Sequence, residues 1–435
     1  MKFIATRLEI LVSLAFLWVC AGIFWPPLSY FVKHPALPLD SSDATNLVAY
    51  AVFAAFLALA AVFRREEMLR GIRLAWPIFA LLVLAYLSAF WSDAPDLVLR
   101  RATTLAITTL FAVYLIVRFE FSQLVSMLVK LNVIAVLGSF AIAALAHHLV
   151  VDGSIDYTTA WRGVYNAKNG LGASSAFGTI LAVYALRHGY GSRLLAVAVI
   201  PANLVLLFLA QSATPLMLLA AAAYVAILAS AFRQRNAGGF AIGFVLAVIG
   251  LLGLALLVIG WTDVLTVLGR SATLTGRTRI WRMSLDNIAE RPWLGYGFNA
   301  FWRPGEVEAR TMWQQLHWIV PHAHNLWLET GLGLGIVGMT AISLVWLAAF
   351  SRGVRVLTVP AARHAVFCLA MLTAILVENL TEYEFLKAGS LYWVLFVAAF
   401  SYLGREVLAA RATATPRHKV AAPLGPVIAT PAAQR

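Results

Sequence analysis

Long apolar runs separated by short polar segments extend from the start of the chain to about residue 403. A transmembrane helix needs about 20 mainly apolar residues, and the runs fit about twelve such helices. Their ranges are 8–31, 45–63, 74–91, 103–117, 124–146, 171–186, 194–210, 215–232, 240–259, 326–350, 365–377 and 391–403. No alternating pattern typical of a membrane β-barrel is present. We therefore predict an all-α, polytopic integral membrane protein.

The same pattern predicts one membrane domain that contains a long polar loop and is followed by a polar tail. We assign residues 1–403 to a single transmembrane domain, interrupted by a long polar loop at 261–324 that carries short helices. Residues 404–435 are mostly Ala, Pro, Thr and Arg and lack the apolar surface needed for a core. We expect them to form a disordered tail.

Composition excludes several classes of protein. Hydrophobic residues make up 61% of the chain and charged residues 12%, against about 25% charged residues in a soluble domain. The net charge of +13 does not indicate nucleic acid, because the basic residues lie in short loops and not on one face. The two cysteines give neither a disulfide framework nor a metal-binding spacing.

The distribution of Lys and Arg predicts the orientation in the bilayer. With the N-terminus inside, the inner segments carry nineteen basic residues and the short outer loops six. The positive-inside rule then places both termini in the cytoplasm. The long loop at 261–324 becomes external although it is rich in arginine. Beyond Trp261 at its start it also contains five tryptophans, which are typical interfacial anchors: Trp281, Trp293, Trp302, Trp313 and Trp318.

Two external segments have the composition of an anion site. Lys168 and Asn169, with Arg162 nearby, lie where a helix begins and leaves backbone N–H groups free. They suit a phosphate or a sugar hydroxyl; helix capping and interfacial anchoring are the alternative. Arg277 and Arg279 lie at the start of an amphipathic helix that ends near Glu290, where the helix dipole disfavours cations. Guanidinium groups bind phosphate oxygens in pairs, which favours an anion site there.

Two further segments carry groups that transfer protons. His322 and His324 lie where the long loop enters a helix, and a neutral histidine is a suitable general base. At this spacing on a helix they would point to different faces, so we predict no metal site. Asn325 would cap the helix, and Glu329 would orient a histidine or a substrate hydroxyl. Glu382 lies in an external group of three carboxylates that either contributes to function or neutralises the arginines.

Together these pieces resemble the O-antigen ligase and polysaccharide polymerase superfamily of bacterial inner-membrane glycosyltransferases. The resemblance rests on Gly276-Arg277-Thr278 with Ile280-Trp281, on Glu290-Arg291-Pro292 with Gly295-Tyr296-Gly297, and on His322-Ala323-His324-Asn325 with Leu328-Glu329. The motifs cover the second half of the chain, and the first half matches mainly by topology.

The resemblance implies an activity and its partners. Such enzymes move a glycan from undecaprenyl diphosphate to an acceptor hydroxyl in the periplasm, without cofactor or metal. Arg277, with Arg279 as its second candidate, would hold the diphosphate, and His324 would activate the acceptor. A flippase and a chain-length regulator are the accessory partners that the resemblance suggests.

Two kinds of acceptor stay open. Ligases that use lipid A-core often have an arginine after a serine before the long loop, but this chain reads Gln211-Ser212-Ala213-Thr214. Arg162 or Arg279 would have to replace that arginine. The stretch from Trp161 to Asn169 is similar to the exopolysaccharide-polymerase branch, so we favour a polymerase over a ligase. A transporter or flippase is the remaining alternative, although the predicted spans lack the mid-membrane charges and internal repeat that would favour it.

Overall fold

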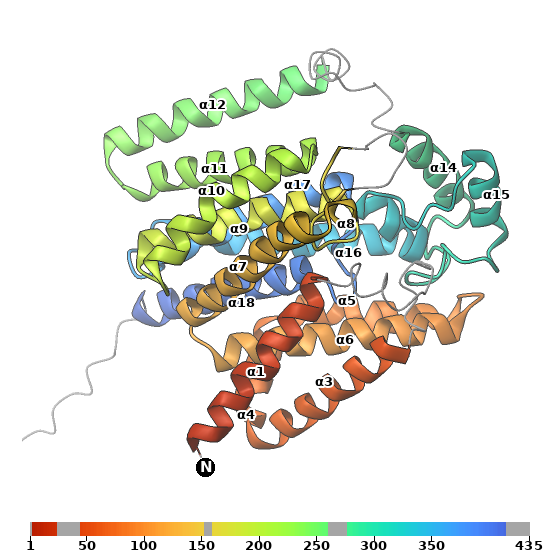
Figure 1. Ribbon diagram of the computed structural model, residues 1–435, viewed down its shortest axis with the longest axis horizontal. Coiled ribbons are helices and arrows are strands. Elements are labelled where there is room, and N and C mark those ends of the chain that lie inside the picture. Colours follow the sequence, from red (N-terminus) through yellow and green to blue (C-terminus); the bar gives the residue numbers. More distant parts are fainter. Residues whose placement is uncertain (1, 24–43, 152–158, 260–275, 415–435) are drawn as a thin grey trace, which may run out of the picture.

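The computed structural model describes residues 2–23, 44–151, 159–259 and 276–414, and most of these residues are helical (Figure 1). The helices are α1 (Lys2–Ala21), α3 (Ala44–Phe63), α4 (Arg65–Leu74), α5 (Trp76–Leu87), α6 (Pro95–Arg118), α7 (Phe121–Leu145), α8 (His147–Val150), α9 (Lys168–His188), α10 (Arg193–Leu209), α11 (Ala213–Arg233), α12 (Ala237–Ile259), α14 (Arg277–Glu290), α15 (Val307–Leu316), α16 (Leu326–Leu357), α17 (Ala365–Thr381) and α18 (Leu391–Ala414), with a 3₁₀ turn at Ser88–Phe90. Within the described ranges the only β-type pairing is one isolated bridge between Val151 and Trp161.

Several of these helices are long and apolar enough to cross a membrane. Among the described residues six qualify singly, and a seventh span arises if the bent pair α3 and α4 is counted as one. Helices α5, α10 and α17 are also apolar but shorter. The predicted class, an all-α polytopic membrane protein, is confirmed, whereas the count of twelve spans is not established by length and composition.

Each predicted apolar run overlaps a helix, but some boundaries differ. Helix α6 begins at Pro95 and not near residue 103, because Pro95 suits a first helical turn and Arg100 and Arg101 are compatible with a helix. Helix α4 lay in a charged stretch that the apolar pattern treated as a loop, and it meets α3 at an angle of 107°. Helix α18 continues past Gly404 to Ala414, which corrects the predicted start of the tail. Residues 415–435 lie outside the described residues.

The helix bundle has a continuous buried core that runs through most of the long helices. Several polar side chains inside it are paired within the protein, which suits an apolar bilayer. Asn132 of α7 and Asn203 of α10 exchange two side-chain hydrogen bonds of 3.3 and 2.8 Å. Thr108 and Thr109 of α6 donate their hydroxyl protons to backbone carbonyls one turn earlier. The interior can therefore hold polar groups without exposing them to lipid.

Helix α16 is interrupted near its beginning, and the interruption attaches the external segment to the bundle. Gly335 has φ 61°, which breaks the helical hydrogen bonding there. The backbone N–H of Tyr296 donates to the carbonyl of Leu332 at 2.8 Å, and Ile336 N–H donates to the carbonyl of Pro292 at 2.7 Å. A side chain at Gly335 would collide with the backbone of residue 293. The turn at 292–297 thus satisfies groups that the broken helix leaves free.

Helices α14 and α15 form a small unit at one end of the bundle, on the right of Figure 1. They share a second buried cluster with the turn at 292–302 and the start of α16, which includes Ile280, Ile288, Phe301, Met312 and Leu332. This unit brings the first turn of α14 to the place where α16 begins. The candidate residues lie at this end of the bundle.

Candidate active site

The candidate histidines lie in a short loop that ends where α16 begins. The side-chain oxygen of Asn325 accepts hydrogen bonds from the backbone N–H groups of Trp327 and Leu328, at 3.0 and 3.1 Å. Its amide nitrogen donates to the carbonyl of Leu380 near the end of α17, at 3.0 Å. Asn325 is therefore the helix cap that the sequence predicted, and it also fixes the histidine loop to α17.

Glu329, in the first turn of α16, holds the same loop in place. Its carboxylate is buried, and one oxygen accepts hydrogen bonds from the indole of Trp302 at 2.9 Å and from the backbone N–H of Ala323 at 2.8 Å. The residue thus contacts the backbone between the two histidines and not a histidine ring. Its contribution in this structure is to position the loop.

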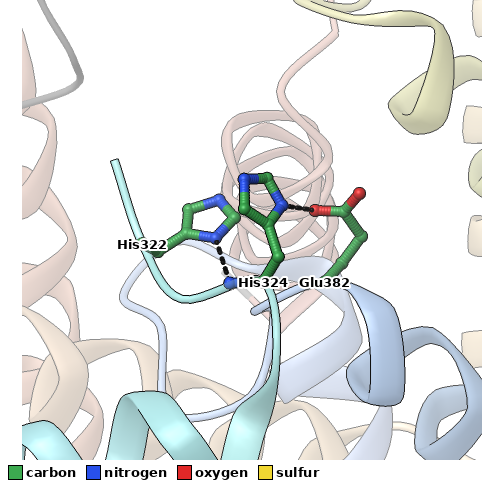
Figure 2. A group of neighbouring side chains, drawn as sticks. All are labelled: His322, His324 and Glu382. Carbon is green, nitrogen blue, oxygen red and sulfur yellow. Dashed lines mark hydrogen bonds and ion pairs between the residues drawn. The ribbon is translucent and has the colours of Figure 1, made fainter. Parts of the chain in front are cut away.

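His322 and His324 lie side by side, because the backbone between them is not helical. His324 has φ 52°, a left-handed conformation that is uncommon for a residue other than glycine. The two ring centroids are 4.1 Å apart, and the backbone N–H of His324 donates to Nδ1 of His322 at 3.2 Å (Figure 2). Burial and the neighbouring His324 lower the pKa of His322. His322 is therefore neutral near pH 7, with its proton on Nε2.

The ring of His324 is oriented by Glu382, which directly follows α17. Nδ1 of His324 lies 2.9 Å from Oε2 of Glu382, and the other ring nitrogen points away from the carboxylate (Figure 2). An ionised carboxylate can only accept hydrogen bonds, so the proton of His324 is on Nδ1. In the neutral ring, Nε2 then carries the lone pair that a general base requires.

The second oxygen of Glu382 binds two other candidate residues. Oε1 accepts hydrogen bonds from the guanidinium of Arg277 at 2.5 Å and from the side-chain amide of Asn169 at 2.7 Å. The oxygen of that amide accepts a hydrogen bond of 2.9 Å from the hydroxyl of Ser212. A continuous chain of contacts therefore runs from Ser212 to His324, and we call Arg277, Asn169, His324 and Glu382 the Glu382 cluster.

The Glu382 cluster is largely shielded from solvent. The side chains of Arg277, His324 and Glu382 are 14%, 17% and 13% exposed. Burial alone would raise the pKa of Glu382, but the hydrogen bond with His324 and the charge of Arg277 hold that pKa well below its ordinary value. The carboxylate is consequently ionised at neutral pH and compensates the arginine.

Four helices begin at these residues or directly beside them: α9, α11, α14 and α16. No side chain caps the first turns of α9, α11 and α14 in the described structure. The free backbone N–H groups and the helix dipoles give such ends a partial positive charge. Together with Arg277 they form a region suited to an anion.

Three other residues that the sequence predicted to bind the substrate have surroundings that differ from those of the Glu382 cluster. Arg162 uses its Nε to bind the carbonyl of Leu149 at 3.0 Å, so it stabilises the turn around α8. Arg279 is exposed on α14, two positions beyond Arg277 and therefore on a different side of the helix. Lys168 is buried in the first turn of α9, adjacent to Asn169. Of the two arginines at the start of α14, the structure brings only Arg277 into contact with the Glu382 cluster.

The three carboxylates expected near the external arginines have different environments. Glu382 contacts Arg277, Glu378 is buried inside α17, and Glu384 forms an ion pair of 2.7 Å with Lys387. The turn between them is fixed by the hydroxyl of Tyr383, which donates to the side chain of Asn299 at 2.8 Å. Of the three carboxylates, Glu382 is the one that forms an ion pair with an arginine of the external segment.

Sequence reasoning missed the part that tryptophans play in building the site. The indole of Trp281 donates to the carbonyl of Ala323 at 3.1 Å, and that of Trp313 donates to the carbonyl of Val320 at 2.9 Å. With Trp302 on Glu329, three of the five expected interfacial anchors instead hold the histidine loop in place. Trp293 and Trp318 are exposed, as an interfacial anchor would be.

The two histidines do not point apart as their spacing would require on a helix. His322, His324 and Glu382 each offer one ligand atom, and these atoms lie within 4.8 Å of one another. The expectation assumed helical geometry, but the histidines precede α16. The three side chains could therefore hold a metal ion, and the prediction of a metal-independent reaction needs its own test.

Comparison with known proteins agrees with the motifs. Residues 194–343 match the family described as O-antigen ligase. The chain is also similar to the exopolysaccharide production protein ExoQ of Rhizobium meliloti (strain 1021), with 26% identity over 345 residues, which cover 76% of this chain and 75% of the relative. The chain is thus a multi-pass membrane protein that is similar, over residues 194–343, to the O-antigen ligase family.

The family match covers only part of the Glu382 cluster. Arg277 and both histidines lie within residues 194–343, whereas Asn169 and Glu382 lie outside that range. The contacts of these two residues come from the folded structure alone.

Proposed function

We propose that this protein is a glycosyltransferase that moves a glycan from undecaprenyl diphosphate to an acceptor hydroxyl. The observation that carries the proposal is the convergence of Arg277, His324 and Asn169 on Glu382 where several helices begin. An anion-binding region thus adjoins a histidine with a free Nε2. Transfer from a diphosphate carrier to a hydroxyl needs both features.

The anion-binding region suits a diphosphate leaving group. Negative charge grows on the diphosphate as its bond to the sugar breaks, and fixed positive groups stabilise that charge. Arg277 supplies a guanidinium fork, and the starts of α9, α11 and α14 supply backbone N–H groups without side-chain caps. We assign the carrier's phosphates to this region.

The histidine suits activation of the acceptor. In the proposed step, Nε2 of His324 takes the proton of the acceptor hydroxyl as its oxygen bonds to the anomeric carbon. The bond between that carbon and the phosphate oxygen breaks, and its electron pair leaves with the diphosphate. Glu382 keeps the opposite nitrogen protonated and the ring in place. We propose that the step uses no metal.

A growing polysaccharide is the acceptor that we favour. The similar Rhizobium protein is described as an exopolysaccharide production protein. Ligases often have a second arginine directly after this serine. Here no arginine follows Ser212, and its hydroxyl donates a hydrogen bond to the uncharged side chain of Asn169. Transfer to lipid A-core is the second candidate, because the matching family is described as O-antigen ligase.

We also propose a location and partners. The excess of Lys and Arg in the predicted inner segments favours the bacterial inner membrane with both termini in the cytoplasm. The Glu382 cluster would then face the periplasm, where a flippase delivers the lipid-linked donor. A chain-length regulator would act on the polymer.

An acceptor competition distinguishes these activities. The purified protein in nanodiscs would receive a lipid-diphosphate repeat unit together with lipid A-core, and the products would be separated by size. We expect polymers that stay on the lipid carrier. Transfer to lipid A-core alone would favour a ligase.

Absence of both products, combined with movement of the donor across reconstituted vesicles, would contradict the proposal and favour a flippase. Arg282→Ala is the matched control variant for the site, because Arg282 is exposed on α14 and, five positions beyond Arg277, lies on another side of the helix.

A further inference from the structure

Glu382 occupies the region where the proposed donor would place its phosphates. Its Oε1 accepts hydrogen bonds from Arg277 and Asn169, and its Oε2 faces His324. These partners come from α14, α9 and the loop before α16. One carboxylate therefore joins the anion-binding residues to the histidine.

The two oxygens of Glu382 have separable partners. A carboxylate and a phosphate present similar oxygens to a guanidinium group, so they compete for Arg277. Loss of the contacts at Oε1 leaves the contact between Oε2 and His324 intact. A diphosphate that binds Arg277 can therefore replace the contact of Arg277 with Oε1, while Oε2 keeps its contact with His324.

We propose that Glu382 is a positioning residue that holds the anion site in the resting protein and yields Arg277 to the donor diphosphate. After this exchange the carboxylate faces His324 alone and holds its proton on Nδ1, so that Nε2 of the neutral ring is directed to the acceptor. Donor binding and orientation of the base are thus coupled through one side chain. This inference rests on the proposed function, because it assumes a diphosphate donor.

The variant Glu382→Gln separates the two effects. Its single amide oxygen would face Arg277 and Asn169, since both of them are donors. The amide NH₂ would then face Nδ1 of His324 and require that nitrogen to accept. The proton of His324 would move to Nε2, which could no longer act as a base. The same variant lacks the negative charge that competes with the donor.

We therefore expect donor affinity and turnover to change in opposite directions. Undecaprenyl diphosphate should bind Glu382→Gln about tenfold more tightly than wild type, because a competing charge next to Arg277 is gone. Turnover at saturating donor should fall about 10²- to 10⁴-fold, because the base is lost. In ¹⁵N NMR spectra of labelled histidine, the proton of His324 should shift from Nδ1 to Nε2.

The matched control is Glu384→Gln, which changes the neighbouring carboxylate that pairs with Lys387 and should leave affinity and turnover near wild type. Equal or weaker binding of undecaprenyl diphosphate by Glu382→Gln, or unchanged turnover, would overturn this inference alone. A wild-type protein that binds no undecaprenyl diphosphate would overturn the proposed function as well.

Discussion

Replacement of His324 by alanine should remove the base and leave the rest of the site assembled. The backbone N–H that donates to Nδ1 of His322 remains in the variant. Glu382 loses one partner but keeps Arg277 and Asn169 on its other oxygen. The expected result is a folded protein that binds donor and transfers glycan slowly.

The size of the effect follows from the geometry of His324. A positioned general base contributes about 10²- to 10⁴-fold to a rate, which corresponds to about 3–5.5 kcal/mol of activation free energy. The cost in folding is smaller, because one hydrogen bond to a charged group contributes about 1.5–3 kcal/mol. His322→Ala removes the acceptor of a backbone N–H and the ring that packs against His324. We expect it to lower turnover by about tenfold or less.

The assay would measure turnover, donor affinity and melting temperature of both variants in nanodiscs. His324→Ala should lose turnover, with donor affinity within about threefold of wild type. Turnover within about threefold of wild type would refute the assignment of the base. Loss of turnover in His322→Ala with normal turnover in His324→Ala would exchange the two assignments.

Three further predictions concern metal, pH and orientation. Turnover should persist in excess EDTA; loss of activity and rescue by one metal would show that His322, His324 and Glu382 bind an essential ion. The pKa of Glu382 in the folded protein lies below its ordinary 4.5, so its contribution to stability is complete above that pH and is lost as the pH falls through the folded pKa. The difference in melting temperature between wild type and Glu382→Gln should therefore not decrease between pH 7 and about pH 5.5, and a decrease between these values would contradict the assigned pKa. Because the two native cysteines are buried, cysteines introduced at Gly305 and Ala237 can report orientation: we expect labelling of intact spheroplasts at Gly305 only, and the reverse pattern would refute the topology.

The apolar pattern predicted the helices well, because lipid requires long apolar segments whose backbone groups are paired internally. It missed α4, whose arginines and glutamates interrupt the apolar run, although the residues that face the bundle there include Met68 and Gly71. It also missed the break at Gly335. That break depends on hydrogen bonds with residues 292–297, and the glycines of α16 alone do not reveal their partner.

The candidate site was predictable where local chemistry gave a signal. Arg277 stood out because a cation is unfavourable at a helix start, and His324 because it lies at the entrance to an apolar helix. The hydrogen bond between Asn169 and Glu382 joins residues that are 213 positions apart in the chain, and no periodic pattern in the sequence indicates it. Such contacts depend on how the helices pack, so sequence reasoning identified the residues without identifying their connection.

The central claim is that this site transfers glycan from a lipid diphosphate with the help of Arg277. The most direct test measures new glycosidic bonds and released undecaprenyl diphosphate in the same reaction, for wild type, Arg277→Lys and the control Arg282→Ala. We predict equal amounts of both products in wild type and the control, and a large loss of both in Arg277→Lys, because a lysine cannot reproduce the guanidinium fork. Polymer formation without release of the carrier diphosphate, or a normal rate in Arg277→Lys, would contradict this account.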